Sequence, residues 1–88
     1  MPTFLLYTTQ YCGFCYRAKD LLDSLSIAYQ EISVDNSPAL RQEMVNLSGG
    51  TTVPQIFIDE KPIGGCNELF ALMRSGELDQ IISQVREA

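Results

Sequence analysis

The 88-residue sequence contains no histidine and no tryptophan, and basic residues are few. The absence of histidine removes the side chain that most often serves as a general base and as a metal ligand. Six Lys and Arg residues against eleven Asp and Glu residues give a formal net charge of -5. Nucleic acids and anionic membrane surfaces repel such a charge, so we expect neither as a partner.

A long apolar run and a basic leader are also missing from the N-terminal residues. Residues 1–7 are too short to span a bilayer and carry no positive charge. Three cysteines cannot form a closed disulfide framework, so we expect thiols in a reducing compartment. The composition is that of a folded globular protein. The sequence therefore predicts one soluble cytoplasmic domain over residues 1–88.

The first third of the chain predicts a strand, a helix and a second strand. Residues 3–8 and 27–35 are rich in β-forming apolar residues, which predicts the two strands. The segment between them predicts a helix that begins at Cys12 and ends at Ser26. Its apolar face is formed by Phe14, Ala18, Leu21, Leu22 and Leu25. This order implies a crossover connection and a parallel pair of strands.

The rest of the chain predicts a second helix, a hairpin and two more helices. Ser37 and Pro38 provide an N-cap and a first helical residue, and the helix stops at Gly49. Residues 55–58 and 61–63 form the hairpin, and helices follow over 66–76 and 78–85. The sequence therefore predicts an α/β fold, a mixed sheet with helices on both faces.

Cys12 and Cys15 lie where the first strand gives way to the first helix. A thiol at a helix N-terminus faces unpaired N–H groups and the positive end of the helix dipole, and both favour the nucleophilic thiolate. Cys15, one turn inward, can attack a disulfide formed on Cys12 but is more shielded. The pair therefore predicts a redox dithiol in which Cys12 attacks and Cys15 resolves.

Two structural alternatives stay open for this pair. It could be half of a zinc site, but zinc takes four ligands and only Cys66 and carboxylates remain. It could also be two buried cysteines that pack as small apolar groups. For Cys66, which lies on the apolar stripe of the third helix, plain packing near the site is favoured.

Two further segments offer backbone groups to a ligand. Val53 precedes a proline and is therefore extended, so its N–H and C=O can pair with an extended peptide. The Gly64-Gly65 pair opens a helix, where N–H groups could hold a carboxylate. A tripeptide thiol with a carboxylate at each end would fit between these features.

These motifs together resemble the glutaredoxin family: C-G-F-C at 12–15, T-V-P at 52–54 and G-G-C-N at 64–67. Within the family the chain is most similar to the small bacterial dithiol type, the third glutaredoxin. The resemblance implies a thioredoxin fold with sheet order 2-1-3-4, glutathione as co-substrate, and a cis peptide bond before Pro54. It implies catalytic roles for Cys12 and Cys15. It also implies a glutathione groove formed by Phe14, Thr52, Val53, Pro54, Gly65, Cys66 and Asn67.

The sequence departs from the family pattern at two places. Gly13 and Phe14 replace the common proline and tyrosine, and Gly-Phe is typical of the monothiol, cluster-carrying members with C-G-F-S. Thr9 stands where the family usually has a lysine or arginine. We therefore expect Arg41 or Gln42 to meet the glycyl carboxylate of glutathione instead.

Three functions follow as hypotheses. The first is a monomeric, glutathione-dependent oxidoreductase that reduces protein disulfides and glutathione mixed disulfides. The alternative is a dimer in which Cys12 of each chain and two glutathiones hold a [2Fe-2S] cluster, as a carrier or sensor. The third is a non-catalytic binding module that uses the Val53 edge.

Overall fold

The computed structural model describes residues 2–86 and has the predicted order of strands and helices. Residues 1, 87 and 88 of the predicted domain lie outside this range. The elements are β1 (Phe4–Thr8), α1 (Gly13–Ser24), β2 (Gln30–Ser33), α2 (Pro38–Ser48), β3 (Gln55–Ile58), β4 (Lys61–Gly64), α3 (Cys66–Ser75) and α4 (Glu77–Arg86). Within residues 2–86, no helix is long and apolar enough to cross a membrane.

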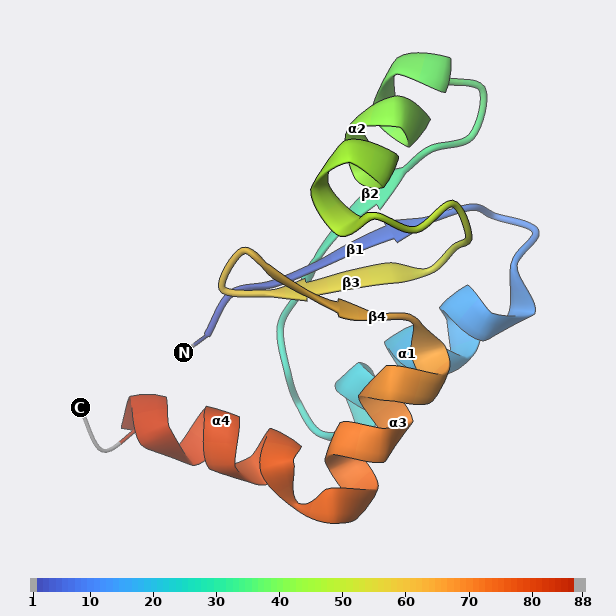
Figure 1. The fold of residues 1–88 in the computed structure, drawn as a ribbon. Coiled ribbons are helices and arrows are strands. Elements are labelled where there is room, and N and C mark those ends of the chain that lie inside the picture. The colour runs from blue at the N-terminus through green and yellow to red at the C-terminus, as the bar shows by residue number, and fades with distance from the viewer. Residues whose placement is uncertain (1, 87–88) are drawn as a thin grey trace.

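The strands form a mixed sheet in the order β2-β1-β3-β4 (Figure 1). β1 pairs with β2 in parallel and with β3 antiparallel, and β4 extends β3 as the second strand of a hairpin. Pro62 lies on β4, an edge strand, where its missing N–H donor costs least. The predicted sheet order is therefore confirmed.

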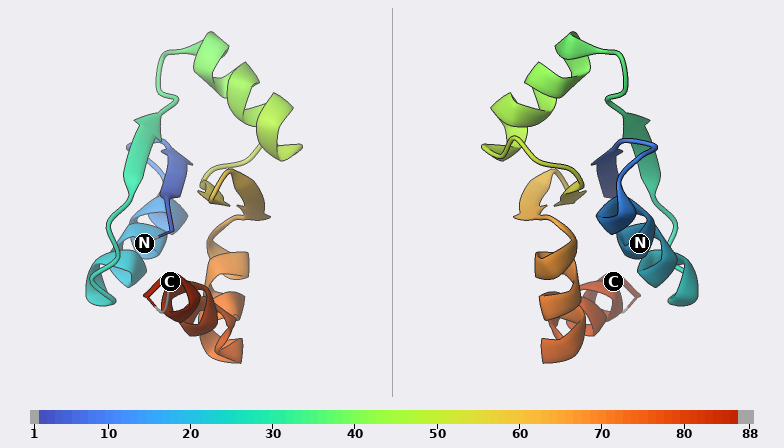
Figure 2. Two further views of the ribbon diagram at one scale, coloured as in Figure 1. Left: turned by 90° about the vertical axis from the view of Figure 1, so that its left-hand side faces the viewer. Right: turned by 90° about the vertical axis from the view of Figure 1, so that its right-hand side faces the viewer.

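Helices cover both faces of the sheet, as Figures 1 and 2 show: α2 on one face and α1, α3 and α4 on the other. β1 alternates between the two, because successive side chains of a strand point in opposite directions. Leu6 packs with Leu22 and Leu69 in the larger core, whereas Tyr7 packs with Met44 in the smaller one. Burial of each large apolar side chain contributes about 1.5–3 kcal/mol. This arrangement of one sheet between two helical layers is the thioredoxin fold.

The structure corrects the predicted ends of two elements. α1 ends at Ser24 rather than Ser26, because Leu25 caps the helix and Ser26 has a left-handed φ of 57°. β2 is shorter than the predicted strand over residues 27–35, since only four of its residues pair with β1. Ile27 is buried within the connection instead.

The two ends of the predicted apolar stripe on α1 are also exposed. Ala18 and Leu22 are buried in the core, but Phe14 in the first turn and Leu25 at the cap are not. Cys15, Ala18 and Leu22 are therefore the buried residues of α1, and the Phe14 side chain in the first turn is available for other contacts.

Candidate active site

Cys12 is the N-cap of α1. Its backbone is extended, and its Sγ accepts a hydrogen bond from the Cys15 N–H at 3.1 Å. As a thiol, Cys12 can donate to the carbonyl oxygen of Val53, which lies 3.5 Å from Sγ. The side chain is half-buried. A sulfur thus occupies the position where helices usually place a capping oxygen, and it is directed toward the segment before Pro54.

Cys15 has a different environment although it lies one helical turn away. Its side chain is 0% exposed. The pKa of the Cys15 thiol is raised from 9.0 to about 12, chiefly by burial and next by a hydrogen bond with Cys12, while a hydrogen bond with the Thr9 backbone lowers it. Cys15 is therefore a protonated thiol at neutral pH. Both cysteines, and Cys66, are free of disulfides.

A groove of about 320 Å³ lies beside Cys12. Its walls come from the first turn of α1, the segment before β3 and the start of α3. The lining residues are Phe14, Thr52, Val53, Pro54, Gly65, Cys66, Asn67 and Glu68. The structure therefore brings together all seven residues of the predicted glutathione groove and adds Glu68. The Val53–Pro54 peptide bond is cis, as the resemblance implied.

The Glu68 side chain packs against the two glycines that precede α3. Its Oε1 accepts the Gly65 N–H at 2.8 Å. A Cβ at position 64 would lie 2.6 Å from the same oxygen, and Gly64 has a left-handed φ of 108°. The Gly65 N–H, expected to be open to a ligand's carboxylate, is therefore already paired within the chain. A glutamate three residues after the helix cap is the sequence signal that could have indicated this.

Cys66 is both a core residue and a wall of the groove. It is 5% exposed and belongs to the same apolar core as Leu69. Burial raises the pKa of its thiol, with the Arg17 guanidinium opposing that effect. The predicted packing of Cys66 is therefore confirmed, and its thiol is held in the neutral form.

Arg41 and Gln42 differ in their relation to the groove. The Arg41 Nη1 lies 3.4 Å from the carbonyl oxygen of Thr51, next to the groove residue Thr52. The Gln42 Nε2 instead donates to the Asn46 Oδ1 at 2.9 Å, along the surface of α2. Of the two expected substitutes for the missing cation at Thr9, only Arg41 is directed toward the rim of the groove.

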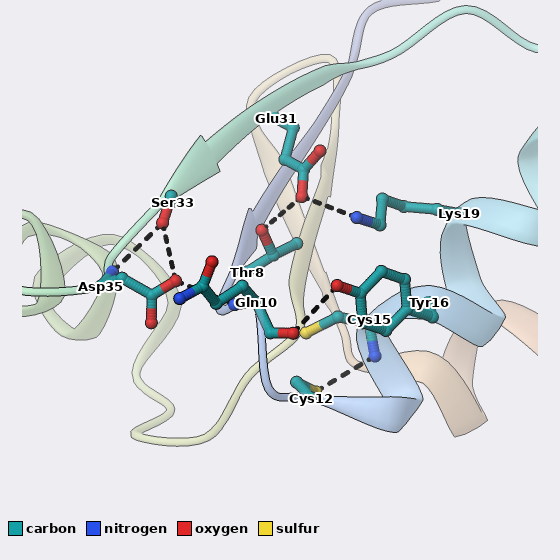
Figure 3. Close-up of polar contacts among 9 residues, drawn as sticks. All are labelled: Thr8, Gln10, Cys12, Cys15, Tyr16, Lys19, Glu31, Ser33 and Asp35. Carbon is teal, nitrogen blue, oxygen red and sulfur yellow. Dashed lines mark hydrogen bonds and ion pairs between the residues drawn. The ribbon is translucent and has the colours of Figure 1, made fainter.

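A polar cleft lies next to the loop between β1 and α1 (Figure 3). In it, the Glu31 carboxylate accepts the Thr8 hydroxyl at 2.6 Å and pairs with the Lys19 ammonium at 3.0 Å. These two contacts lower the pKa of Glu31, the Thr8 hydrogen bond being the larger cause. They join residues 23 and 12 positions apart, which no spacing in the sequence could have indicated.

Metal-ligating side chains are dispersed in this structure. Within residues 2–86, no three His, Cys, Asp or Glu side chains gather in a way that could hold a metal ion. Cys12 and Cys15 therefore have no third ligand from the same chain beside them in the described region.

Comparison with known proteins identifies relatives over nearly the whole chain. The family model for glutaredoxins matches residues 4–63. Glutaredoxin 3 of Escherichia coli (strain K12) is 49% identical over 82 residues, which cover 93% of this chain and 99% of the relative. A glutaredoxin of Pseudomonas aeruginosa is 48% identical over 83 residues, covering 94% and 99%. Among solved structures, a buckwheat glutaredoxin–glutathione complex superposes with a TM-score of 0.85 at 32% identity, covering 94% of this chain and 78% of that one.

Proposed function

The chain belongs to the glutaredoxin family, and on this premise we propose that it is a glutathione-dependent thiol–disulfide oxidoreductase with Cys12 as the nucleophile. The observation that carries the proposal is the position of the Cys12 Sγ. It lies at the N-terminus of α1, 3.1 Å from the Cys15 nitrogen and 3.5 Å from the Val53 oxygen at the wall of the groove. Donors at a helix terminus favour a thiolate, which is the attacking species in disulfide exchange.

The first reaction is removal of glutathione from a protein thiol. The Cys12 thiolate attacks the glutathionyl sulfur, so a Cys12–glutathione disulfide forms and the protein leaves as a thiolate that takes up a proton. A second glutathione, as its thiolate, then attacks the same glutathionyl sulfur. Cys12 is released as thiolate and glutathione disulfide is the product. The sulfur of the second glutathione is thereby oxidised and the sulfur of the protein thiol is reduced, while the first glutathionyl sulfur stays in a disulfide throughout.

The second reaction is reduction of a protein disulfide, and it requires Cys15. After Cys12 has formed a mixed disulfide with the substrate, the Cys15 sulfur attacks Cys12 and the second substrate thiolate departs. Because the pKa of Cys15 is about 12, its proton must leave as the attack proceeds. The departing thiolate can accept it. The Cys12–Cys15 disulfide that results is reduced by two molecules of glutathione.

The groove residues have proposed roles in holding glutathione. The backbone of Val53 pairs with the cysteinyl unit, while Cys66 and Asn67 meet the γ-glutamyl end. Arg41 meets the glycyl carboxylate, since its guanidinium already reaches the carbonyl next to Thr52. Phe14 and Pro54 supply apolar walls. The buckwheat relative, whose structure is a complex with glutathione, supports glutathione as the ligand.

We assign the remaining properties on the same basis. Residues 1–88 form a single glutaredoxin domain that acts as a monomer in the cytoplasm. Its partners are glutathione and disulfide-bearing or glutathionylated proteins, because the groove and the dithiol are adjacent. The net charge of -5 gives it no attraction for nucleic acids or anionic membranes.

The test is a coupled assay in which glutathione, glutathione reductase and NADPH report turnover of a glutathionyl mixed disulfide. The wild-type protein should be active, and Cys12→Ser should reduce turnover to the uncatalysed rate. Circular dichroism of the variant should show the wild-type fold. A folded Cys12→Ser protein with more than a tenth of the wild-type rate would contradict the assignment.

One observation favours a second candidate function, the carrying of a [2Fe-2S] cluster. A Cβ at position 13 would meet no atom within 4 Å, so packing within the chain does not require glycine there. Open space beside Cys12 would permit close approach of a second chain. Cys12 of two chains and two glutathione thiols would supply the four thiolates that such a cluster takes.

Purification without oxygen in the presence of glutathione distinguishes the two functions. A cluster-carrying dimer would be brown, with visible absorbance and the mass of two chains. A colourless monomer that also fails reconstitution with iron and sulfide would remove this candidate.

A further inference from the structure

Exposed aromatic side chains are concentrated around Cys12. Large hydrophobic side chains exposed in the described region are Tyr11, Phe14, Tyr16, Leu25 and Leu47. Three of these are aromatic and lie within four positions of Cys12. Tyr11, which directly precedes the nucleophile, has the largest exposed fraction of the five, at 87%. Exposed aromatic rings grouped next to a reactive thiol point to a contact surface for a partner.

The loop that carries Tyr11 is held on both sides. The Gln10 N–H donates to the Asp35 Oδ2 at 2.8 Å, and the Tyr16 hydroxyl donates to the Gln10 carbonyl oxygen at 2.9 Å (Figure 3). The Ser33 hydroxyl in turn donates to the same Asp35 oxygen at 3.1 Å. Both backbone polar groups of the residue before Tyr11 are therefore paired. A ring presented by a fixed backbone loses little freedom when it binds a partner.

Tyr11 lies outside the proposed glutathione groove. Phe14 lines that groove, but Tyr11 and Tyr16 do not, and Tyr16 instead borders the polar cleft on β2 and α1. A glutathionylated protein brings two groups to Cys12: the glutathionyl unit, and the polypeptide that carries the other sulfur. The groove of about 320 Å³ is the site proposed for the first. The polypeptide must therefore cross the surface around Cys12 that the groove does not include.

We propose that Tyr11 is a specificity-determining residue, whose ring contacts the polypeptide around the disulfide of a protein substrate and makes no contact with glutathione. The inference rests on the proposed function, since it states which part of the substrate binds to the surface next to Cys12. The position of Tyr11 supports the substrate polypeptide as that part, because Tyr11 is adjacent in the chain to the residue that attacks the substrate. Tyrosine suits this role, as it adds large contact area with only two side-chain torsions.

Two substrates that share a glutathionyl group test the proposal. One is glutathionylated serum albumin, and the other is the mixed disulfide of glutathione and cysteamine, which has no polypeptide. For Tyr11→Ala we expect kcat/KM for albumin to fall about fivefold to tenfold, the usual effect of losing an aromatic contact. The loss should lie in KM, and kcat/KM for the cysteamine disulfide should stay within about twofold.

Two control variants separate the ring from general surface effects. Tyr11→Phe keeps the ring and should retain wild-type kcat/KM on both substrates. Leu47→Ala removes another exposed hydrophobic side chain, 55% exposed on α2, and should also leave both values unchanged.

Three outcomes would overturn the proposal: equal losses of Tyr11→Ala on both substrates, no loss on albumin, or a loss in Tyr11→Phe as large as in Tyr11→Ala. These three outcomes can be distinguished from a failure of the proposed function itself. If the proposed function were wrong, the wild-type protein would not turn over the cysteamine disulfide.

Discussion

Cys12 and Cys15 are separated by only two residues, yet the environments of their sulfur atoms at the start of α1 differ in burial and in hydrogen bonding. At the edge, the Cys12 sulfur receives a backbone N–H and faces the groove. One turn inward, the Cys15 side chain is fully buried and burial raises its pKa to about 12. This difference in burial along one helix is the basis for the separate roles that we propose for the two thiols. Four experiments test this difference, from the largest expected effect to the smallest.

Alkylation at neutral pH should show the largest difference. A thiol with a pKa of about 12 has about one part in 10⁵ as thiolate at pH 7, and burial also hinders the reagent. Cys12 should therefore react with iodoacetamide about a thousandfold or more faster than Cys15, as measured by peptide mass spectrometry over time. Comparable alkylation rates of Cys12 and Cys15 would contradict the proposal that Cys12 is the reactive thiol and Cys15 the shielded one.

Replacement of Cys15 by serine should separate the two reactions. Serine cannot resolve a mixed disulfide, so reduction of a protein disulfide should fall about a hundredfold. Removal of glutathione from a mixed disulfide needs only Cys12 and should stay within about threefold. The two rates are measured on one preparation. If both fell together, Cys15 would have a role in the first reaction as well.

Stability at alkaline pH should report the buried thiol directly. The folded pKa of Cys15 lies above the unfolded value of 9.0, so its contribution to stability is complete below pH 9 and is lost as pH rises toward 12. Burial raises the pKa values of Cys66 and Tyr7 in the same direction. The free energy of unfolding, measured with urea on the reduced protein, should therefore fall from pH 9 upward.

The Cys15→Ser variant serves as the control for that decline, since its hydroxyl does not titrate. Its free energy of unfolding should fall less steeply between pH 9 and 11 than that of the wild type. Identical slopes would mean that Cys15 ionises in the folded chain as it does in the unfolded one.

The smallest effect is expected from Glu68, which supports the groove beside Cys12. Glu68→Ala removes the oxygen that pairs with the Gly65 N–H, and loss of such a cap costs about 0.5–2 kcal/mol. For a chain of this size, Tm should fall by several degrees, about 4–8 °C per kcal/mol. Glu68→Gln keeps an acceptor and should lose less. The ratio of Cys12 to Cys15 alkylation should not change, because Cys15 lies in the core and not in the groove.

The sequence was sufficient for the elements that have strong local signals. Ser37 caps α2 through its hydroxyl, with Pro38 as the first helical residue, as the pattern predicted. Cys12 caps α1, as expected from the change at that residue from a polar loop to apolar residues with a helical period of 3.6. The groove residues were predictable through the resemblance to the glutaredoxin family. In that family the three motifs, which are far apart in the chain, lie together around one groove.

Contacts between distant residues were not predictable. Phe14 continues the apolar period of α1, so periodicity alone placed it in the core, but in the first turn it is Cys15 that is buried, and Phe14 beside it is exposed. The contacts of Asp35 with Gln10 and of Glu31 with Lys19 depend on the register of β1 and β2 and on how α1 packs. No local sequence pattern around these residues indicates which distant side chain each of them will contact.

The most direct test of the central claim is to trap the covalent intermediate. Cys15→Ser protein is treated with glutathione disulfide, digested without reducing agent and analysed by mass spectrometry. Attack by Cys12 predicts one glutathionyl group per chain, attached to Cys12, while the buried Cys66 stays unmodified. A glutathionyl group found mainly on Cys66, or no modification of Cys12, would contradict the account.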